Sequence, residues 1–404
     1  MQPAAMSREF WTFHSAGEVI FGRGAISRLP SLTRRFGARR IALITDPGIE
    51  AAGVLAPVLA VLRDAGIEPL LYAQAMPEPD LASVRRCRDA LAEARPELLI
   101  ALGGGSSIDL AKIVAAWLTH GGRVADYYGE NKLPGPVLPI IAIPTTAGTG
   151  SEVSPVAIVS DDELGMKVGL SDNRLRPAVA LLDPELTLKL PPHVTACTGM
   201  DALTQAIEAR YGKDHRWVET DGEPIYQGAN PMSGVLAERA ITLIAQHLAT
   251  AVHQGSNLEA RSGMLLGSLL SALAFSNSGV SWVHAVAYPI ADLAPRPHGE
   301  LVGLLLPYGM RYNAVAAPPT FARIGELLGA APQAPLDERI DAGIERIFAL
   351  LRSLGLPTRL SQIGLRAEQI EGIVERSLTI ERLNRLNPRR PVKADLVHLL
   401  QEAL

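Results

Sequence analysis

The sequence has little cysteine and no basic run, and each absence excludes a class of protein. Only two of its 404 residues are cysteines, Cys87 and Cys197, and they form no CxxC spacing. Neither a disulfide framework nor a thiolate zinc site is therefore predicted, and the usage is typical of the reducing cytoplasm. The formal net charge is only -4 and lysine and arginine form no extended run, so we expect no nucleic-acid partner.

Long apolar segments are also absent. The longest apolar stretch, Met264 to Phe275, is interrupted by serine and is shorter than the ~20 residues that cross a bilayer. Residues 1–13 lack the apolar core of a secretory signal. We therefore expect no membrane partner and a cytoplasmic location.

What is present is enough apolar material for two domains. Hydrophobic residues make up 48% of the chain, and 404 residues exceed what one core usually serves. Residues 1–190 alternate short apolar runs with helical patterns, which predicts an α/β domain around a parallel sheet. The predicted strands are Arg40 to Thr45, Pro69 to Tyr72, Leu98 to Leu102, Leu138 to Ile143 and Ala178 to Leu182.

Residues 191–404 have a different pattern, with long stretches of helical periodicity such as Val235 to Thr250 and Ala260 to Phe275. They predict a separate all-α domain. The polar, turn-rich segment Lys213 to Gln227 is interpreted as a surface loop, either a tolerated insertion or a lid.

A glycine turn between a strand and a helix indicates a nucleotide site. The run Leu98 to Lys112 reads LLIALGGGSSIDLAK, and Gly103, Gly104 and Gly105 would let the backbone approach a pyrophosphate at the helix N-terminus. Ser106 and Asp109 have capping-box spacing. Alone, such a turn is more often a simple connection.

Two further loops support the nucleotide interpretation. Asp46 follows an earlier strand, where an acid can accept hydrogen bonds from ribose hydroxyls and repel a 2′-phosphate, which favours NAD over NADP. The loop 144–152, PTTAGTGSE, offers Thr145 and Thr146 at the end of another strand. Because the carboxyl ends of parallel strands meet at one edge, these loops should converge on one crevice.

The helical half contains a set of metal-ligand residue types. Asp201 and Gln205 are four residues apart, on one helix face, and Glu208 lies one turn further. His284 and His298 come from a second, mostly apolar segment. A carboxylate and two imidazoles are a plausible set for Zn²⁺ or Fe²⁺ with an open position. The alternative is that each histidine is a hydrogen-bonded core residue.

Taken together, these motifs resemble the iron-containing (group III) alcohol dehydrogenases, whose superfamily includes glycerol dehydrogenase and 3-dehydroquinate synthase. The resemblance covers nearly the whole chain and runs through FGRGAISRL, ITDPG, ALGGGSSIDLAK, IPTTAGTGSEVSPVA, LLDPELTLKLPP, TGMDALTQAIEA, ANPMSGVLAERAI and the stretch from His284 to Asn313. It implies a dinucleotide-binding α/β domain, a helical metal-binding domain, and hydride transfer between nicotinamide and a small alcohol or aldehyde. It also suggests a homodimer.

The resemblance carries over residue by residue. It implies NAD contacts at Asp46, Gly103, Gly104, Gly105, Ser106, Asp109, Thr145, Thr146 and Lys167. It implies metal ligation by Asp201, His284 and His298, the subset that glycerol dehydrogenase-like members use for zinc.

Two positions depart from the family pattern. Gln205 stands where the family usually has a histidine ligand, and an amide oxygen coordinates only weakly. Tyr288 stands where a histidine is thought to help release the hydroxyl proton, and a phenol is a poor proton acceptor near neutral pH. Both changes favour a polar or anionic substrate.

Three other functions remain open at this point. A hydroxyacid-oxoacid transhydrogenase would keep its nicotinamide bound through turnover. A non-catalytic nucleotide-binding paralogue would explain Gln205 and Tyr288. A cyclising synthase would need basic residues that the metal-motif segments lack.

Overall fold

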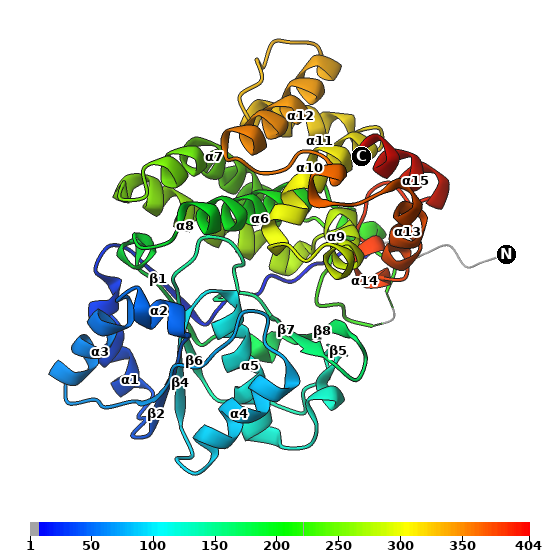
Figure 1. Ribbon diagram of the computed structural model, residues 1–404. Helices are drawn as coiled ribbons and strands as arrows, with labels where there is room; N and C mark the ends of the chain where they lie inside the picture. Colours follow the sequence, from blue (N-terminus) through cyan, green and yellow to red (C-terminus); the bar gives the residue numbers. More distant parts are fainter. Residues whose placement is uncertain (1–7, 221) are drawn as a thin grey trace. The chain divides into compact units, whose positions relative to one another are not determined.

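The computed structural model describes residues 8–220 and 222–404, in two compact units (Figure 1). His14–Leu190 form an α/β unit, and Pro191–Leu404 form a helical unit. The predicted combination of an α/β domain with an all-α domain is confirmed. Residues 8–13 differ from the expectation, because they belong to the helical unit, where the Gln227 side chain bonds to Arg8 and Thr12.

A six-stranded parallel sheet forms the centre of the α/β unit. In the order of the sheet its strands are β1 (Glu18–Phe21), β9 (Val179–Leu182), β6 (Ile140–Pro144), β4 (Leu98–Gly103), β2 (Ile41–Ile44) and β3 (Leu70–Tyr72). All five predicted strands are present. The edge strand β1 escapes prediction because it has only four residues and is half exposed.

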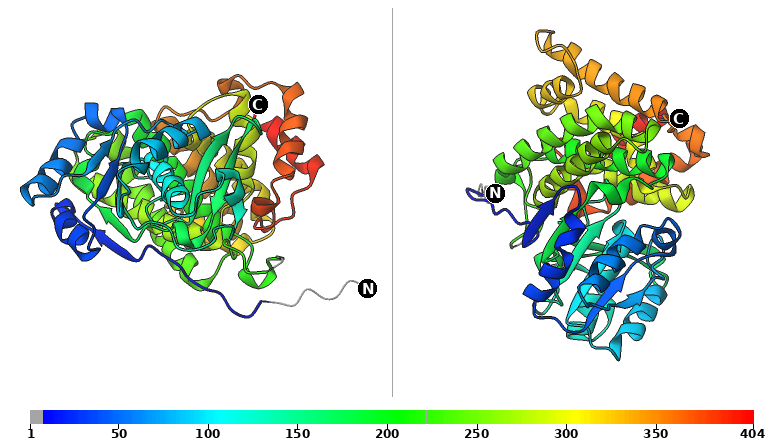
Figure 2. Two further views of the ribbon diagram at one scale, coloured as in Figure 1. Left: turned by 90° about the horizontal axis from the view of Figure 1, so that it is seen from below. Right: turned by 90° about the vertical axis from the view of Figure 1, so that its left-hand side faces the viewer.

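Helices cover both faces of this sheet (Figure 2). Alternate strand residues such as Leu43 and Ile100 pack against α1 (Leu29–Arg35) and α3 (Leu55–Asp64). Their neighbours, such as Ala42 and Ala101, pack against α4 (Leu81–Ala92) and α5 (Gly105–His120). A strand buried on both sides must be apolar throughout, which explains the uninterrupted runs in the sequence. The short helix α2 (Pro47–Ala51) follows β2.

A second, three-stranded sheet was not predicted. It contains β5 (Gly129–Glu130), β8 (Met166–Ser171) and β7 (Val156–Asp161), in that order, and β7 and β8 form an antiparallel hairpin. The buried Lys112 of α5 holds this sheet in place by donating to the carbonyl oxygens of Ser154 at 2.9 Å and Val156 at 2.8 Å.

Three long helices form the core of the helical unit: α6 (Pro192–Tyr211), α7 (Pro231–His253) and α8 (Leu258–Ser278). The remaining helices are α9 (Trp282–Leu293), α10 (His298–Ala314), α11 (Pro318–Leu327), α12 (Leu336–Ser353), α13 (Ile370–Leu378), α14 (Glu381–Asn384) and α15 (Lys393–Glu402). Single 3₁₀ turns occur at Ala25–Arg28, Val124–Tyr127, Asn173–Leu175, Pro184–Thr187, His215–Trp217, Leu360–Ile363 and Ala367–Gln369.

Helices α7 and α8 are long and apolar enough to cross a membrane by composition alone. They instead pack against each other and against α6. Glycines permit this close approach, because a Cβ at Gly263 would lie 2.2 Å from the His247 ring and one at Gly267 would lie 2.8 Å from Ile244. Their apolar residues therefore serve the core of this unit.

The segment Lys213 to Gln227 is more buried than a surface loop. Gln227 is only 2% exposed, and its backbone amide donates to the Asn277 carbonyl at 2.8 Å. Residue 221 lies outside the described residues. Three apolar residues of this otherwise polar segment pack against the C-terminal region. The resulting small cluster contains Val218, Ile225, Tyr226 and Leu386.

Candidate functional site

Helix α6 presents three polar side chains inside the helical unit. Asp201, Gln205 and Glu208 are 4%, 5% and 0% exposed. Their spacing of four and three residues places them along one face, as the sequence predicted. Buried polar groups on a core helix require hydrogen-bond partners or a bound ion, so this face of α6 is a candidate binding site.

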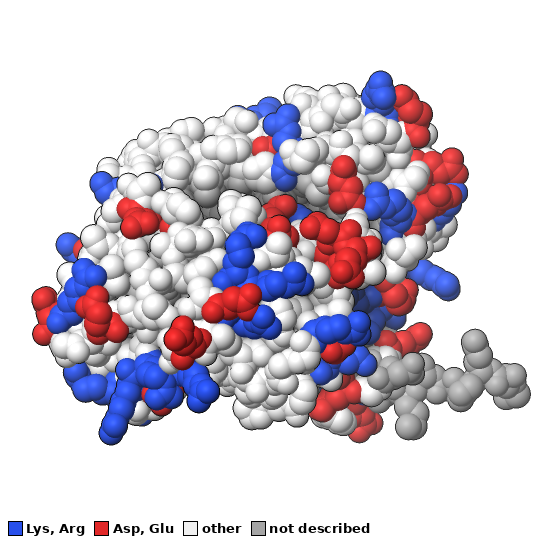
Figure 3. Space-filling model, turned by 60° about the horizontal axis from the view of Figure 1, so that its bottom comes forward, with Lys and Arg blue, Asp and Glu red and all other residues white. Residues whose placement is uncertain are grey.

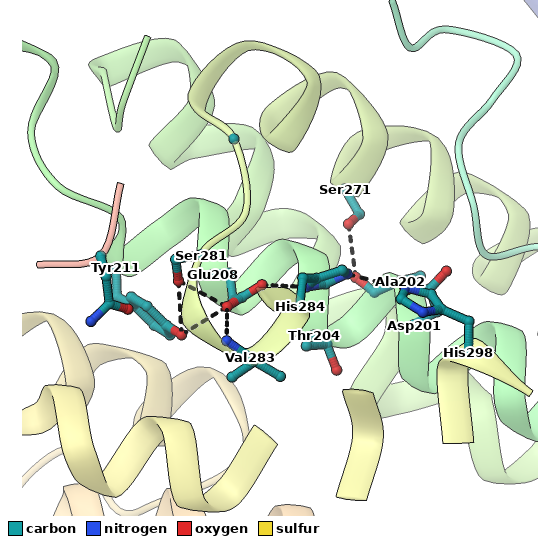
Figure 4. Close-up of polar contacts among 12 residues, drawn as sticks. Asp201, Ala202, Thr204, Glu208, Tyr211, Ser271, Ser281, Val283, His284 and His298 are labelled. Atoms are coloured by element: carbon teal, nitrogen blue, oxygen red, sulfur yellow. Dashed lines mark hydrogen bonds and ion pairs between the residues drawn. The ribbon is translucent and has the colours of Figure 1, made fainter. Parts of the chain in front are cut away.

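Two histidines face Asp201 from other helices (Figure 4). The Nε2 atom of His284, near the start of α9, lies 3.6 Å from Asp201 Oδ1. The Nε2 atom of His298, the first residue of α10, lies 3.8 Å from the same oxygen. Gly299 allows α10 to begin here, since a Cβ at that position would lie 1.9 Å from the Cys197 carbonyl oxygen.

The donor atoms of Asp201, His284 and His298 fit a metal ion. In tetrahedral coordination at about 2.0–2.2 Å, donor atoms are about 3.3–3.6 Å apart. The 3.6 and 3.8 Å separations are close to this, and all three donors lie within 4.8 Å of one another. Asp201 Oδ1 and His284 Nε2 are buried without a hydrogen-bond partner among the described residues, as is expected of atoms that coordinate a cation.

Glu208 orients His284 from behind. Its carboxylate contacts His284 Nδ1 and accepts hydrogen bonds from the Ser281 hydroxyl at 2.8 Å and the Val283 amide at 3.0 Å. In the neutral ring, an Nδ1–H donated to Glu208 leaves Nε2 unprotonated and directed at Asp201. The position of Glu208 one turn beyond Gln205 is evident from the sequence, but its role is not. Its signal was the turn-by-turn spacing from Asp201.

The negative charges of Glu208 and Asp201 favour binding of a cation at this site. Burial lowers the pKa of His284, but the charges and hydrogen bonds of Glu208 and Asp201 outweigh burial and raise that pKa to about 10. The imidazole therefore binds a proton strongly when no metal competes, and metal binding would displace that proton.

The two residues that depart from the family pattern also lie here. Gln205 Oε1 is buried with no hydrogen-bond partner among the described residues. The Tyr288 ring centroid lies 6.2 Å from that of His298. An amide oxygen one helical turn from Asp201 and a phenol beside His298 are thus available to a metal or a substrate.

In the α/β unit, the predicted nucleotide loops meet at the carboxyl ends of β2, β4 and β6. Asp46, directly after β2, accepts a hydrogen bond from the Ile49 amide through Oδ1 and one from the Ser107 hydroxyl through Oδ2, both at 3.0 Å. A Cβ at Gly103 would lie 3.1 Å from Asp46 Oδ2. Ser107, which the sequence analysis did not single out, thereby links two of the predicted loops.

The N-terminus of α5 differs from the prediction. The N-cap is Gly104, without a side-chain cap, and Ser106 Oγ instead accepts the Glu78 amide at 3.2 Å. The predicted capping box of Ser106 and Asp109 is therefore wrong. Asp109 is buried and accepts hydrogen bonds from Ser151 and from the Ile158 amide, because it connects α5 to the loop 144–152 and to β7.

An uncapped helix start beside small residues fits an anionic cofactor. A Cβ at Gly104 would lie 3.3 Å from Thr146, and one at Gly105 would lie 2.8 Å from Thr149. Thr145 Oγ1 is buried without a hydrogen-bond partner among the described residues. Free helical amides and an unpaired hydroxyl suit the pyrophosphate and ribose of a dinucleotide.

Lys167 is linked to the start of α5 through Glu78, whose backbone amide donates to Ser106. Its ammonium group pairs with Glu78 at 2.6 Å, with 27% of the lysine side chain and 58% of the glutamate side chain exposed. An exposed pair of this kind is weak, so Lys167 could exchange Glu78 for a phosphate at small cost.

Charges of both signs are interspersed on the face shown in Figure 3. Many arginines there and elsewhere pair with acids, as Arg40 does with Glu97 and Arg123 with Asp126. This distribution matches the small net charge.

Comparisons with known proteins agree with both halves of the chain. Residues 16–184 match iron-containing alcohol dehydrogenase, and residues 195–404 match the C-terminal part of the Fe-containing alcohol dehydrogenase family. The chain is 31% identical to the NAD-dependent methanol dehydrogenase of Bacillus methanolicus, over 95% of this chain and 97% of that protein.

Solved structures show the same fold. A 1,3-propanediol oxidoreductase superposes with a TM-score of 0.91 at 32% identity, covering 98% of this chain and all of the other. The sulfoacetaldehyde reductase of Bifidobacterium kashiwanohense, in complex with NAD⁺, gives a TM-score of 0.85 at 29% identity, covering 98% and 99%. The chain therefore belongs to the iron-containing alcohol dehydrogenase family, as its motifs predict, and is an oxidoreductase acting on CH–OH groups with NAD and a divalent metal as cofactors.

Proposed function

We propose that this protein interconverts a small aldehyde bearing a polar or anionic tail and the corresponding alcohol, with NAD as hydride carrier. The observation that carries the proposal is the convergence of Asp201, His284 and His298 beside an unpaired Gln205 carbonyl oxygen. Metal-ligand geometry accounts for the alcohol dehydrogenase chemistry. The unpaired amide and Tyr288 account for the polar substrate.

Asp201, His284 and His298 would hold Fe²⁺ or Zn²⁺. When bound, a divalent ion stabilises negative charge on a substrate oxygen during hydride transfer. Glu208 keeps the His284 ring in the orientation that this requires. Asp201 and His284 are only 4% and 5% exposed, and this exclusion of water strengthens the charge interactions between them.

The proposed NAD contacts are the uncapped α5 start at Gly103 to Ser106, the hydroxyls of Thr145 and Thr146, and Asp46 for the ribose. Lys167 would contribute by leaving Glu78. The carboxylate of Asp46 is fixed by Ile49 and Ser107, so it would meet a 2′-phosphate as a rigid negative charge. We assign Asp109 to the support of loop 144–152, because both its oxygens already accept hydrogen bonds.

Gln205 and Tyr288 would select the substrate. Gln205 can offer its amide to a polar tail or its oxygen weakly to the metal, and the Tyr288 phenol can hydrogen-bond to a hydroxyl proton. The similarity to a sulfoacetaldehyde reductase, a protein named for an anionic aldehyde, supports this substrate class.

We also propose a cytoplasmic homodimer. The two free cysteines, Cys87 and Cys197, are buried, as expected of thiols in a reducing compartment. Sedimentation of the purified chain tests the dimer.

The experiment that tests the function is NADH oxidation by the purified protein against neutral and anionic aldehydes, first with Zn²⁺ or Fe²⁺ and then with a chelator. We expect turnover that the chelator abolishes and that is fastest with a polar or anionic aldehyde. Asp201→Ala should abolish turnover, whereas Asp292→Ala, at a surface ion pair with Arg376, should change it less than about twofold. Undiminished activity in Asp201→Ala would exclude the metal role. NADH binding without turnover of any aldehyde would point to a transhydrogenase or a non-catalytic paralogue.

A further inference from the structure

A second group of metal-ligand residues lies in the helical unit. His193 and Cys197 are four residues apart on α6, and Glu300 comes from the first turn of α10. One donor atom from each residue lies within 4.8 Å of the other two. None of the three residues belongs to the Asp201 centre, and the sequence analysis singled out none as a ligand.

The separations of these donors fit tetrahedral zinc. Zn–S and Zn–N bonds of about 2.3 and 2.0–2.1 Å place sulfur and nitrogen about 3.6 Å apart, and nitrogen and oxygen about 3.4 Å apart. Cys197 Sγ lies 3.7 Å from His193 Nε2, and Glu300 Oε2 lies 3.8 Å from the same nitrogen. A small contraction around an ion would bring all three into bonding distance.

Glu300 provides an independent observation. The residue is only 3% exposed, and its carboxylate makes two long ion pairs. Its Oε1 faces Arg296 Nη1 at 3.6 Å, and its Oε2 faces His193 Nε2 at 3.8 Å. A cation bound between Glu300 and His193 would bring this carboxylate a closer partner than either.

The charges around Cys197 also favour a cation. The carboxylates of Glu300 and Asp201 both act on the Cys197 sulfur as negative charges. A divalent ion would reverse that surplus of negative charge and replace the thiol proton, releasing one proton for each ion bound. Exposure of the His193 side chain, at 60%, gives the ion a path from solvent.

We propose that His193, Cys197 and Glu300 bind a second ion, Zn²⁺, at a site distinct from the catalytic centre. A thiolate, an imidazole and a carboxylate suit zinc, and the thiolate disfavours Mg²⁺ and Ca²⁺. Because the ligands come from α6 and α10, the ion joins the two helices one turn from Asp201 on α6 and beside His298 on α10.

Cobalt substitution tests this directly, since Co²⁺ bound to a thiolate gives a charge-transfer absorption that oxygen and nitrogen ligands do not. The full-length protein is stripped of metal and titrated with Co²⁺. We expect two Co²⁺ ions per chain and a thiolate band that saturates with one of them. Zn²⁺ should displace both ions and remove the band.

Matched variants separate the two sites. Cys197→Ala and His193→Ala should each bind one Co²⁺ and lose the band, and His193 is exposed, so its removal should not disturb folding. Asp201→Ala should also bind one Co²⁺ but keep the band. Cys87→Ala, which removes the other buried thiol, should behave as the unmodified chain does.

The readout is independent of the aldehyde reductase proposal. An inactive protein with an intact thiolate band would leave the second site standing and overturn only the proposed function. A metal-dependent reductase without a thiolate band at saturating Co²⁺ would overturn the second site alone. Loss of the band in Asp201→Ala would show a single shared site and would also overturn the inference.

Discussion

The Nε2 atom of His284 faces Asp201 Oδ1 at 3.6 Å because the other nitrogen of the same ring is held by Glu208. Glu208 therefore orients His284, which forms the metal site together with Asp201 on the same helix as Glu208. The relation between His284 and Asp201 depends on a proton, since Nε2 can bind metal only when the ring proton is on Nδ1.

Glu208→Gln is expected to weaken metal binding by about 10- to 100-fold without changing the size of the side chain. An amide cannot satisfy all its neighbours. If its oxygen accepts the Val283 amide, its NH₂ faces His284 Nδ1 and moves the ring proton to Nε2; if it is turned over, two donors meet at Val283.

Competition with a chelating dye measures the affinity of this variant. The control is Glu238→Gln on α7, which removes a carboxylate paired with Arg210 and Arg323 and should leave metal affinity unchanged. Equal affinity in Glu208→Gln and the unmodified chain would show that Glu208 does not orient His284.

Gln205→His should raise metal affinity by about tenfold or more, because an imidazole replaces an amide oxygen that has no hydrogen-bond partner among the described residues. The same change should reduce turnover of polar aldehydes relative to neutral ones, since the amide is lost. Chelator competition and kcat/KM across the aldehyde panel measure the two effects. Gln254→His, on the exposed end of α7, adds a histidine without this neighbourhood and should do neither.

Asp46→Ser should shift cofactor preference toward NADPH by at least about tenfold in the ratio of kcat/KM values, because it removes a fixed carboxylate. Serine can still cap α2 through the Ile49 amide, so the fold should be retained. Asp80→Ser makes the same exchange at the N-cap of α4 and is the control. An unchanged preference in Asp46→Ser would contradict the assignment of Asp46 to the ribose.

Local patterns predicted the parts of this structure that depend on local physics. Strands that are buried on both faces have continuous apolar sequences, and β2, β4 and β6 were predicted from such sequences. The spacing of Asp201 and Gln205 on one helix also needed only helix geometry. The prediction that Asp201, His284 and His298 form one site rested on their ligand types and on the family resemblance, because nothing local specifies which helices pack together.

The features that escaped prediction depend on contacts between distant residues. Asp109 has the spacing of a helix cap, but its carboxylate serves Ser151 and Ile158, which are more than forty positions away. The cluster of His193, Cys197 and Glu300 needs the close contact of α6 with Gly299, which no periodicity reveals. The β7–β8 hairpin was not predicted, although alternate residues of β7 are buried and Ala157, Val159 and Leu170 lie in the core of the α/β unit.

Glu152 makes the stability of the α/β unit depend on pH. It is 2% exposed, and burial raises its pKa from 4.5 to about 7, against the smaller opposing effects of a backbone hydrogen bond and Lys112. A carboxyl group with a raised pKa in the folded state contributes stability that is fully present below about pH 4.5 and is lost as the pH rises through 7. The difference corresponds to roughly 3 kcal/mol.

Glu152→Gln removes the titrating proton and keeps the shape, so its stability relative to the unmodified chain should increase between about pH 5 and about pH 8. Thermal unfolding followed at both pH values measures that difference, and Glu163→Gln, on the exposed β7–β8 turn, is the control. The opposite result is expected if the Glu152–Lys112 ion pair stabilises the folded protein by more than burial of the Glu152 charge costs. Glu152→Gln would then be less stable than the unmodified chain at pH 8. That result would mean that Lys112, whose own pKa burial lowers to about 8, holds Glu152 ionised in the folded protein.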